Sequence, residues 1–237
     1  MCMFKRSDQP ELMDLGPAFY TAEEYDDCLH KLGIIGTVFG SDAATLKAFH
    51  ALPVTPQSIL DVGCGGGAFT VKLAQNFPQA RVVGIDIVPE ALVAAQTHQL
   101  SQEHKSAHEF KNLSFEHREY PQLAEPEKSF DVVTATLVFH HLNDDNLIEF
   151  LRAAGTIARK AIIINDLHRH PLAYAAFWLI APLFKNRMIR NDGLLSIKRG
   201  FTRAELKKYL QAAGFAPGSY KIRWRWAFRW IVTVTCS

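Results

Sequence analysis

The stretch over residues 59–69 constrains the fold of this chain more than any other part of the sequence. A short apolar run ends at Asp61, and a helix-like pattern begins a few residues later. Four glycines lie between them, at Gly63, Gly65, Gly66 and Gly67. Glycine lets a backbone adopt positive φ and approach a ligand closely, and the helix that follows points free N–H groups at that ligand. The pattern predicts a strand–loop–helix unit that binds a nucleotide-like cofactor, whereas an ordinary tight turn would need only one or two glycines.

Two families use such a loop. Gly63, Gly65 and Ala68 satisfy the dinucleotide pattern G-x-G-x-x-G/A, which leaves an NAD(P)-dependent oxidoreductase open. The fuller pattern D-x-G-x-G-x-G, however, resembles motif I of the class I S-adenosylmethionine (SAM)-dependent methyltransferases. In that family the loop passes the methionine part of SAM, and the acidic residue helps to hold its amino group. The resemblance implies SAM as cofactor, bound by Asp61, Gly63, Cys64, Gly65 and Gly67.

Strand-like and helix-like stretches alternate after residue 57, which favours a parallel sheet covered on both faces. Strands are expected over 58–62, 81–86, 113–116, 130–136, 161–165, 219–225 and 228–235. Helices are expected over 22–32, 42–52, 67–76, 144–158 and 202–213, with one more that has Pro89 in its first turn. A terminal antiparallel hairpin is a second resemblance to the same family. The predicted fold is therefore α/β, a Rossmann-like doubly wound seven-stranded sheet, mostly parallel, with an N-terminal helical lid.

Length and composition limit the organisation of the chain. Its 237 residues, 48% of them hydrophobic, suit an N-terminal helical cap over 1–52 and a methyltransferase domain over 53–237 with a lid insertion near 171–201. A net charge of +2 gives no reason to expect a nucleic-acid partner. The four scattered cysteines indicate reduced thiols in the cytoplasm. We find neither a signal peptide nor an apolar run long enough for stable membrane insertion, and a homodimer stays open.

Further cofactor contacts are expected where the later strands end. Asp86 ends the strand over 81–86, where a carboxylate can accept hydrogen bonds from a ribose diol. The resemblance assigns Asp86 to the ribose of SAM and Ile87 to its adenine. It also makes Glu119 the candidate for the adenine amino group, although this charged stretch can equally be a solvated surface. Thr136 and Leu137 end the strand over 130–136 and are expected to line the site.

Histidines follow two of the strands and suggest how an acceptor is activated. His140 and His141 resemble a stretch found in small-molecule methyltransferases, and Asp166 and His168 follow the next strand. An imidazole with a pKa of about 6.5 can remove the proton of a phenol whose pKa is about 10. His140 and His141 are therefore the candidate catalytic residues, with a buried structural histidine as the alternative for each. The ligand set for a metal is incomplete, so no metal is expected.

The segment over 171–201 combines an aromatic, apolar half with a basic half, which suggests a lid over a hydrophobic acceptor or a weak contact with a membrane surface. The expected activity is methyl transfer from SAM to a hydroxyl of a small aromatic or polyketide-like acceptor, of the bacterial natural-product or quinone type, in secondary metabolism. C-methylation of a similar acceptor, an NAD(P)-dependent oxidoreductase and a SAM-binding module without catalysis are the alternatives.

Overall fold

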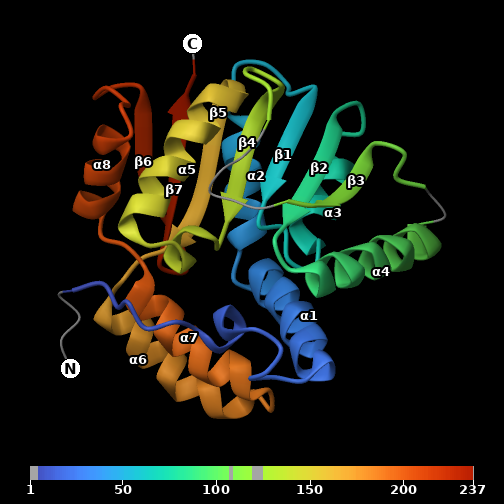
Figure 1. The fold of residues 1–237 in the computed structure, drawn as a ribbon, viewed down its shortest axis with the longest axis vertical. Coiled ribbons are helices and arrows are strands. Elements are labelled where there is room, and N and C mark those ends of the chain that lie inside the picture. Colours follow the sequence, from blue (N-terminus) through green and yellow to red (C-terminus); the bar gives the residue numbers. More distant parts are fainter. Residues whose placement is uncertain (1–4, 107–108, 119–124, 237) are drawn as a thin grey trace.

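The computed structural model describes residues 5–106, 109–118 and 125–236, and in this part of the chain seven strands form one sheet (Figure 1). The strands are β1 (Ser58–Val62), β2 (Arg81–Asp86), β3 (Leu113–His117), β4 (Phe130–Thr136), β5 (Ala158–Leu167), β6 (Tyr220–Arg225) and β7 (Arg229–Thr235). The α-helices are α1 (Ala22–Val38), α2 (Ser41–His50), α3 (Ala68–Asn76), α4 (Pro89–Ser106), α5 (Asp144–Ile157), α6 (Pro171–Ile180), α7 (Arg187–Arg199) and α8 (Arg203–Ala212). Three short 3-10 helices are η1 (Leu12–Leu15), η2 (Phe139–His141) and η3 (Ala181–Leu183).

The order of the strands is β3-β2-β1-β4-β5-β7-β6. β7 runs antiparallel to both β5 and β6, and the other neighbouring strands are parallel. The chain therefore starts in the middle of the sheet, moves to one edge and then returns toward the other. This confirms the Rossmann-like, doubly wound fold with a terminal hairpin.

Apolar side chains cover both faces of the sheet, as the run of buried residues in β1 and β4 requires. One face packs against α5 and α8 through residues such as Leu147, Phe150 and Leu206. The other face packs against α2 and α3, with Phe49 and Leu73 in its core. The central strands are thus rigid, and their carboxyl ends form a fixed edge for a ligand.

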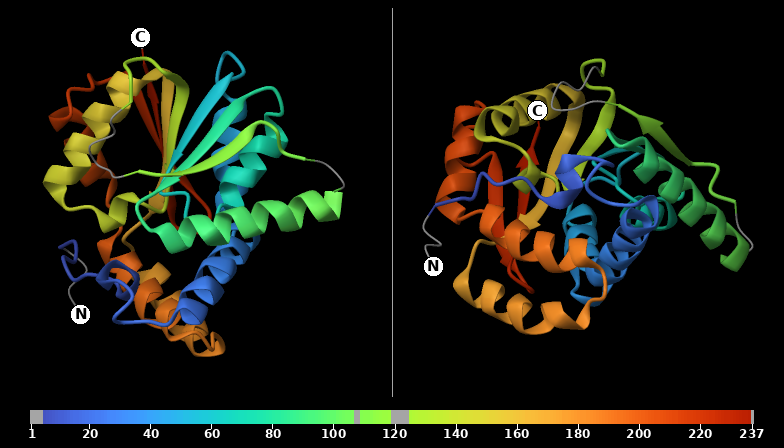
Figure 2. Two further views of the ribbon diagram at one scale, coloured as in Figure 1. Left: turned by 45° about the vertical axis from the view of Figure 1, so that its right-hand side comes forward. Right: turned by 60° about the horizontal axis from the view of Figure 1, so that its bottom comes forward.

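The cap combines α1 of the N-terminal region with α6 and α7 of the segment after β5. Figures 1 and 2 show α1, α6 and α7 beyond the carboxyl ends of the parallel strands, whereas α2 lies against the sheet. Tyr25 and Cys28 of α1 pack with Met188 and Ile189 of α7, which joins the N-terminal region to the segment after β5. No helix of the described residues is long and apolar enough to cross a membrane.

Asp131 lies at the start of β4, at the end of the sheet away from the cap. Its carboxylate accepts hydrogen bonds from Gln57 N (2.7 Å), Arg159 Nε (2.9 Å) and Lys160 Nζ (2.8 Å). These contacts fix the entry into β1 and β5. Asp131 is therefore a structural residue.

Several elements are longer than the sequence patterns indicate. α1 continues to Val38, and β5 begins at Ala158 and ends at Leu167. β5 gains its extra residues because both neighbours pair with them, Phe130 with Ala158 and Arg229 with Leu167. Tertiary pairing extends a strand past the point where its own apolar pattern stops.

Candidate active site

The glycine loop is tied to the end of β2. The N–H groups of Gly63 and Cys64 donate to the carbonyl oxygen of Ile85 at 2.8 and 3.0 Å. Gly67 has a φ of 71°, and a Cβ at this position would lie 2.8 Å from the Cβ of Ala95. Only glycine permits this close approach of the loop to α4 without a shift. Gly65 also has positive φ, at 52°, so the loop turns sharply before α3 begins.

Asp86 organises this loop from the end of β2. Its Oδ2 accepts from Gly65 N at 2.8 Å, and its Oδ1 accepts from Val88 N at 3.0 Å. Burial raises the pKa of the Asp86 carboxyl. Each carboxylate oxygen can accept a further hydrogen bond, so this side chain can also take a pair of hydroxyl groups from the cavity that it lines. Ile87 lines the same cavity and is half-exposed, so it offers an apolar surface next to Asp86.

Asp61 is a buried carboxyl at the end of β1. Its Oδ2 accepts a hydrogen bond from Thr70 Oγ1 at 2.7 Å, and the side chain lines the cavity. Burial raises the pKa of Asp61 to about 7. A cation next to Asp61 would favour its ionised form, which fits a ligand with an amino group at this position.

We expect Asp61→Asn to stabilise the protein without ligand. The unfolded carboxyl titrates near pH 3.8 and the folded one near 7, so ionisation removes stability as the pH rises through this window. Asparagine keeps an oxygen for Thr70 and never ionises. The melting temperature should exceed that of the wild type by roughly 4 °C or more at pH 8, and the difference should shrink toward pH 5. Asp26→Asn, on the exposed face of α1, is the control, and equal melting curves at pH 8 would contradict this account of Asp61.

Two residues at the end of β4 border the cavity. The hydroxyl oxygen of Thr136 is buried and has no hydrogen-bond partner among the described residues. Leu137 has a φ of 59°, which is costly for a side chain of this kind, and its N–H donates to Asn165 O at 2.8 Å. This turn leaves space beside Thr136 and leads the chain into η2. Glu119, the residue expected near an adenine, lies outside the described residues.

The cavity joins the glycine loop to the cap. Its volume is about 1560 Å³, enough for two small ligands side by side. Aromatic and aliphatic residues of the cap form one wall: Tyr20, Leu32, Phe177, Ile180 and Phe184. Polar groups from η1, η2 and α7 form another wall. The cavity therefore combines an apolar lining with a few convergent polar groups.

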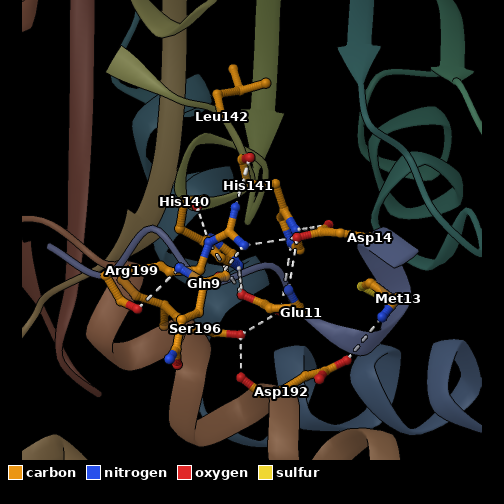
Figure 3. Close-up of polar contacts among 12 residues, drawn as sticks. Gln9, Glu11, Met13, Asp14, His140, His141, Leu142, Asp192, Ser196 and Arg199 are labelled. Carbon is orange, nitrogen blue, oxygen red and sulfur yellow. Dashed lines mark hydrogen bonds and ion pairs between the residues drawn. The ribbon is translucent and has the colours of Figure 1, made fainter. Parts of the chain in front are cut away.

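The two histidines of η2 belong to this polar wall (Figure 3). His140 Nδ1 lies 2.8 Å from Asp166 Oδ1, and His141 Nδ1 lies 2.6 Å from Asp14 Oδ1. The Nε2 atoms of both rings face Glu11, at 3.7 Å from its Oε1 for His140 and 4.0 Å from its Oε2 for His141. The carboxylates fix both ring orientations and place a proton on Nδ1, which leaves Nε2 as the basic atom of each neutral ring.

Arg199 of α7 links the two histidines to Asp14. Its Nε donates to His140 O, its Nη2 to His141 O, both at 2.7 Å, and its Nη1 to Asp14 Oδ2 at 2.8 Å. Glu11 is 2% exposed, and Ser196 donates to its Oε2 at 2.8 Å. Sequence reasoning missed Glu11, Asp14 and Arg199, because no local motif marks them and they come from segments far apart in the chain.

These contacts shift the pKa values of His141 and Asp14. Burial alone would lower the pKa of His141, but the hydrogen bond to Asp14 and the charges of Glu11 and Asp14 raise it above its ordinary value. Burial alone would raise the pKa of Asp14, but the contact with His141 and the charge of Arg199 help to lower it to about 2. Asp14 is therefore ionised at neutral pH, and His141 is a stronger base than a free histidine.

Among the described residues, Glu11, His140 and His141 form a group that could hold a metal ion. Each offers one ligand atom, and these atoms lie within 4.8 Å of one another. Imidazole and carboxylate are suitable ligands for zinc and related ions. Arg199 Nε, however, lies 3.9 Å from Glu11 Oε1 and already brings positive charge to this position. That charge disfavours a second cation there.

The other two candidates, Asp166 near the end of β5 and His168 directly after it, have separate positions. Asp166 accepts from Phe139 N at 2.8 Å and from its own neighbour Leu167 N at 2.7 Å, in addition to its contact with His140. It therefore positions η2 and does not face a ligand directly. His168 lines the cavity and packs against Trp230, with ring centroids 4.8 Å apart.

Comparisons with known proteins agree with this geometry. Residues 59–161 match the family described as "Methyltransferase domain". The ubiquinone biosynthesis O-methyltransferase of Azorhizobium caulinodans is 32% identical over 191 residues, which are 78% of this chain and 68% of that protein. The protein of the same name from Albidiferax ferrireducens is 33% identical over 128 residues, so that the match spans only 47% of its length. Human N-acetylserotonin methyltransferase in complex with SAM has a TM-score of 0.66 at 18% identity, over 93% of this chain and 58% of that chain.

The fold and the loop therefore define a SAM-dependent methyltransferase. The chain belongs to the class I family of these enzymes, and SAM is its cofactor. The resemblance of the glycine loop to motif I is thereby confirmed. The relatives and solved structures named above are methyltransferases, and none is named as a dinucleotide-dependent oxidoreductase.

Proposed function

We propose that this chain transfers a methyl group from SAM to a hydroxyl group of a small aromatic or polyketide-like acceptor. One observation carries the proposal: His141, oriented by an ionised carboxylate, lines the same cavity as the glycine loop and the apolar cap. A relative named as an O-methyltransferase, at 32% identity, supports the same chemistry.

The cofactor half of the cavity lies at the ends of β1, β2 and β4. The loop residues Gly63, Cys64, Gly65 and Gly67 pass along the methionine part of SAM. Asp61 faces its amino group, Asp86 accepts hydrogen bonds from the ribose, and Ile87 packs against the adenine. Thr136 and Leu137 border the space in which the methyl group meets the acceptor. The fit rests on the buried Asp61, on the free hydroxyl of Thr136 and on a loop that tolerates no Cβ at Gly67.

The chain's own residues activate and align the acceptor. SAM supplies a methyl group made electrophilic by the positively charged sulfur. His141 accepts the hydroxyl proton at Nε2, while Asp14 holds the ring and stabilises the imidazolium that results. His140 packs beside it, with ring centroids 4.2 Å apart, and faces the same carboxylate of Glu11. Residues 5–39 and the lid over 171–201 line the acceptor end of the cavity.

The test is incubation with methyl-labelled SAM and a small-molecule extract of the cells that carry this protein. Mass spectrometry identifies each product that gains the label, and the carbon chemical shift of the new methyl group separates O-methyl from C-methyl. We expect one main O-methylated product with an aromatic or enolic hydroxyl. A C-methyl product would replace the O-transfer assignment with the alternative, and label in nucleic acid or protein alone would contradict a small-molecule acceptor.

A further inference from the structure

Arg229 is a buried cation with no hydrogen bond to two of its three guanidinium nitrogens among the described residues. It begins β7, is 4% exposed, and lines the cavity. Its Nε and Nη1 atoms are buried and have no hydrogen-bond partner among the described residues. A guanidinium stays charged at neutral pH, and a buried charge is strongly unfavourable unless it is paired. The structure thus places an unsatisfied positive group at the wall of the ligand cavity.

The charges of Asp166 and Asp42 favour the Arg229 cation, but neither carboxylate is within ion-pair distance of it. Asp42 of α2 pairs with Lys72 and accepts from the hydroxyl of Thr37. Asp166 is held by His140 and by backbone N–H groups. Asp166 also precedes Leu167, the register partner of Arg229, and successive strand residues face opposite sides of a sheet. Both carboxylates therefore have other partners.

The surroundings of Arg229 suit an anion. Thr136 pairs in register with Asn165, two residues before Leu167, so Thr136 and Arg229 share one face of the sheet. Thr136 lines the cavity on that face, and its buried hydroxyl oxygen has no hydrogen-bond partner among the described residues. Ser41, the first residue of α2, lines it as well, and the N-terminus of this helix adds a positive dipole end. Three positive or donating groups thus border one part of the cavity.

We propose that Arg229 forms a carboxylate-binding subsite for a small molecule held in this cavity, an inference that rests on the proposed function for the identity of that molecule. A guanidinium can offer a carboxylate two parallel N–H donors, from Nη2 together with either Nε or Nη1, in a bidentate contact. Such a subsite fixes the anionic end of a ligand and thereby orients its reactive group within the cavity. Arg229 is then a specificity-determining residue, and the preferred ligand is an anion with an apolar body.

The position in the sheet favours the acceptor as the source of this carboxylate. β7 lies three strands from β1, which at about 4.8 Å per strand is roughly 14 Å from the strand that leads into the glycine loop. The hairpin residues Trp226 and Phe228 line the cavity next to Arg229 and can contact a flat ring. The carboxylate of SAM itself is the second possible source, since it lies at the end of the cofactor that is farthest from the adenine.

Two matched pairs of probes separate these sources by calorimetry on the whole protein. The cofactor pair is S-adenosylhomocysteine and its decarboxylated analogue. The acceptor pair is 4-hydroxybenzoate and neutral 4-hydroxybenzamide, titrated into protein saturated with S-adenosylhomocysteine. We expect the wild type to prefer the carboxylate of the acceptor pair by at least about 10-fold, and Arg229→Gln to lose that preference. Loss in the cofactor pair instead would assign the same subsite to SAM.

The matched control is Arg223→Gln, which removes an exposed arginine of the neighbouring strand β6 and should leave both preferences intact. Arg229→Lys keeps the positive charge but not the bidentate donor geometry, so an intermediate preference for the carboxylate is expected. This variant serves as the test if Arg229→Gln does not fold. Equal binding of both members of each pair by the wild type, or a preference that survives in Arg229→Gln, would overturn the subsite. These are binding measurements, so a failed methylation assay would count against the proposed function and not against this result.

Discussion

Asp86→Ala should abolish tight binding of the cofactor while the sheet stays folded. The carboxylate accepts hydrogen bonds from Gly65 N and Val88 N, so its removal releases the loop. It also removes the two hydrogen bonds expected from the ribose. Hydrogen bonds to a charged group contribute about 1.5–3 kcal/mol each. Losing two of them predicts a fall in affinity for S-adenosylhomocysteine of at least about 100-fold by calorimetry. Methyl transfer should fall in parallel at subsaturating SAM.

Asp86→Asn and Asp145→Ala complete this experiment. Asparagine keeps one oxygen acceptor and loses the charge, so an affinity between those of the wild type and Asp86→Ala is expected. Asp145 is exposed at the start of α5, and its removal should change neither affinity nor melting temperature. Wild-type affinity in Asp86→Ala would remove Asp86 from the cofactor site.

The part of the site that the sequence predicts well is the part encoded by neighbouring residues. β1 and β2 have the expected bounds, and α3 begins one residue later than expected, because an apolar run, a glycine loop and a helix pattern follow each other directly. Backbone hydrogen bonds from the loop to Ile85 then bring β1 and β2 together at their carboxyl ends. A sequence motif therefore predicts the geometry of this part of the site, because its residues are close together in the chain.

The acceptor side depends on contacts that no local pattern encodes. Glu11, Asp14 and Arg199 meet His141 only after the N-terminal segment and α7 fold over the ends of the strands. Arg229 looks like an ordinary strand-edge arginine in the sequence, and its burial follows from pairing with β5 and packing against α2. Side chains from distant segments therefore decide what the cavity accepts, and only the structure reveals them.

His140 and His141 are adjacent in the sequence but differ in exposure and in the carboxylate that each one contacts. His140 is 3% exposed and is bound to Asp166 through Nδ1, so it supports η2 from the inside. His141 is the more accessible ring and is bound to Asp14 from the N-terminal segment. Adjacent residues on a short 3-10 turn thus receive different carboxylate partners. This difference leads us to expect the larger catalytic effect at His141.

His141→Gln should slow methyl transfer without weakening the binding of the cofactor. A general base contributes about 100- to 10,000-fold to a rate, so kcat should fall within that range on the acceptor found by the labelling assay. Affinity for S-adenosylhomocysteine should stay within about 2-fold, because its contacts come from β1 and β2. His141 must be neutral to act, and its raised pKa places the acidic limb of the rate profile above about pH 6.5. This limb should disappear in His141→Gln.

The rate of His141→Gln on a more acidic acceptor distinguishes a general base from a residue that only supports the structure. A nitro-substituted analogue of the acceptor has a more acidic hydroxyl and needs little help to lose its proton, so His141→Gln should recover much of the wild-type rate on it. His104→Gln, on the exposed face of α4, is the matched control and should leave both the rate and its pH profile unchanged. An equal loss of rate on both acceptors would show that His141 only holds η2 in place, and the proton would then have to leave through another group.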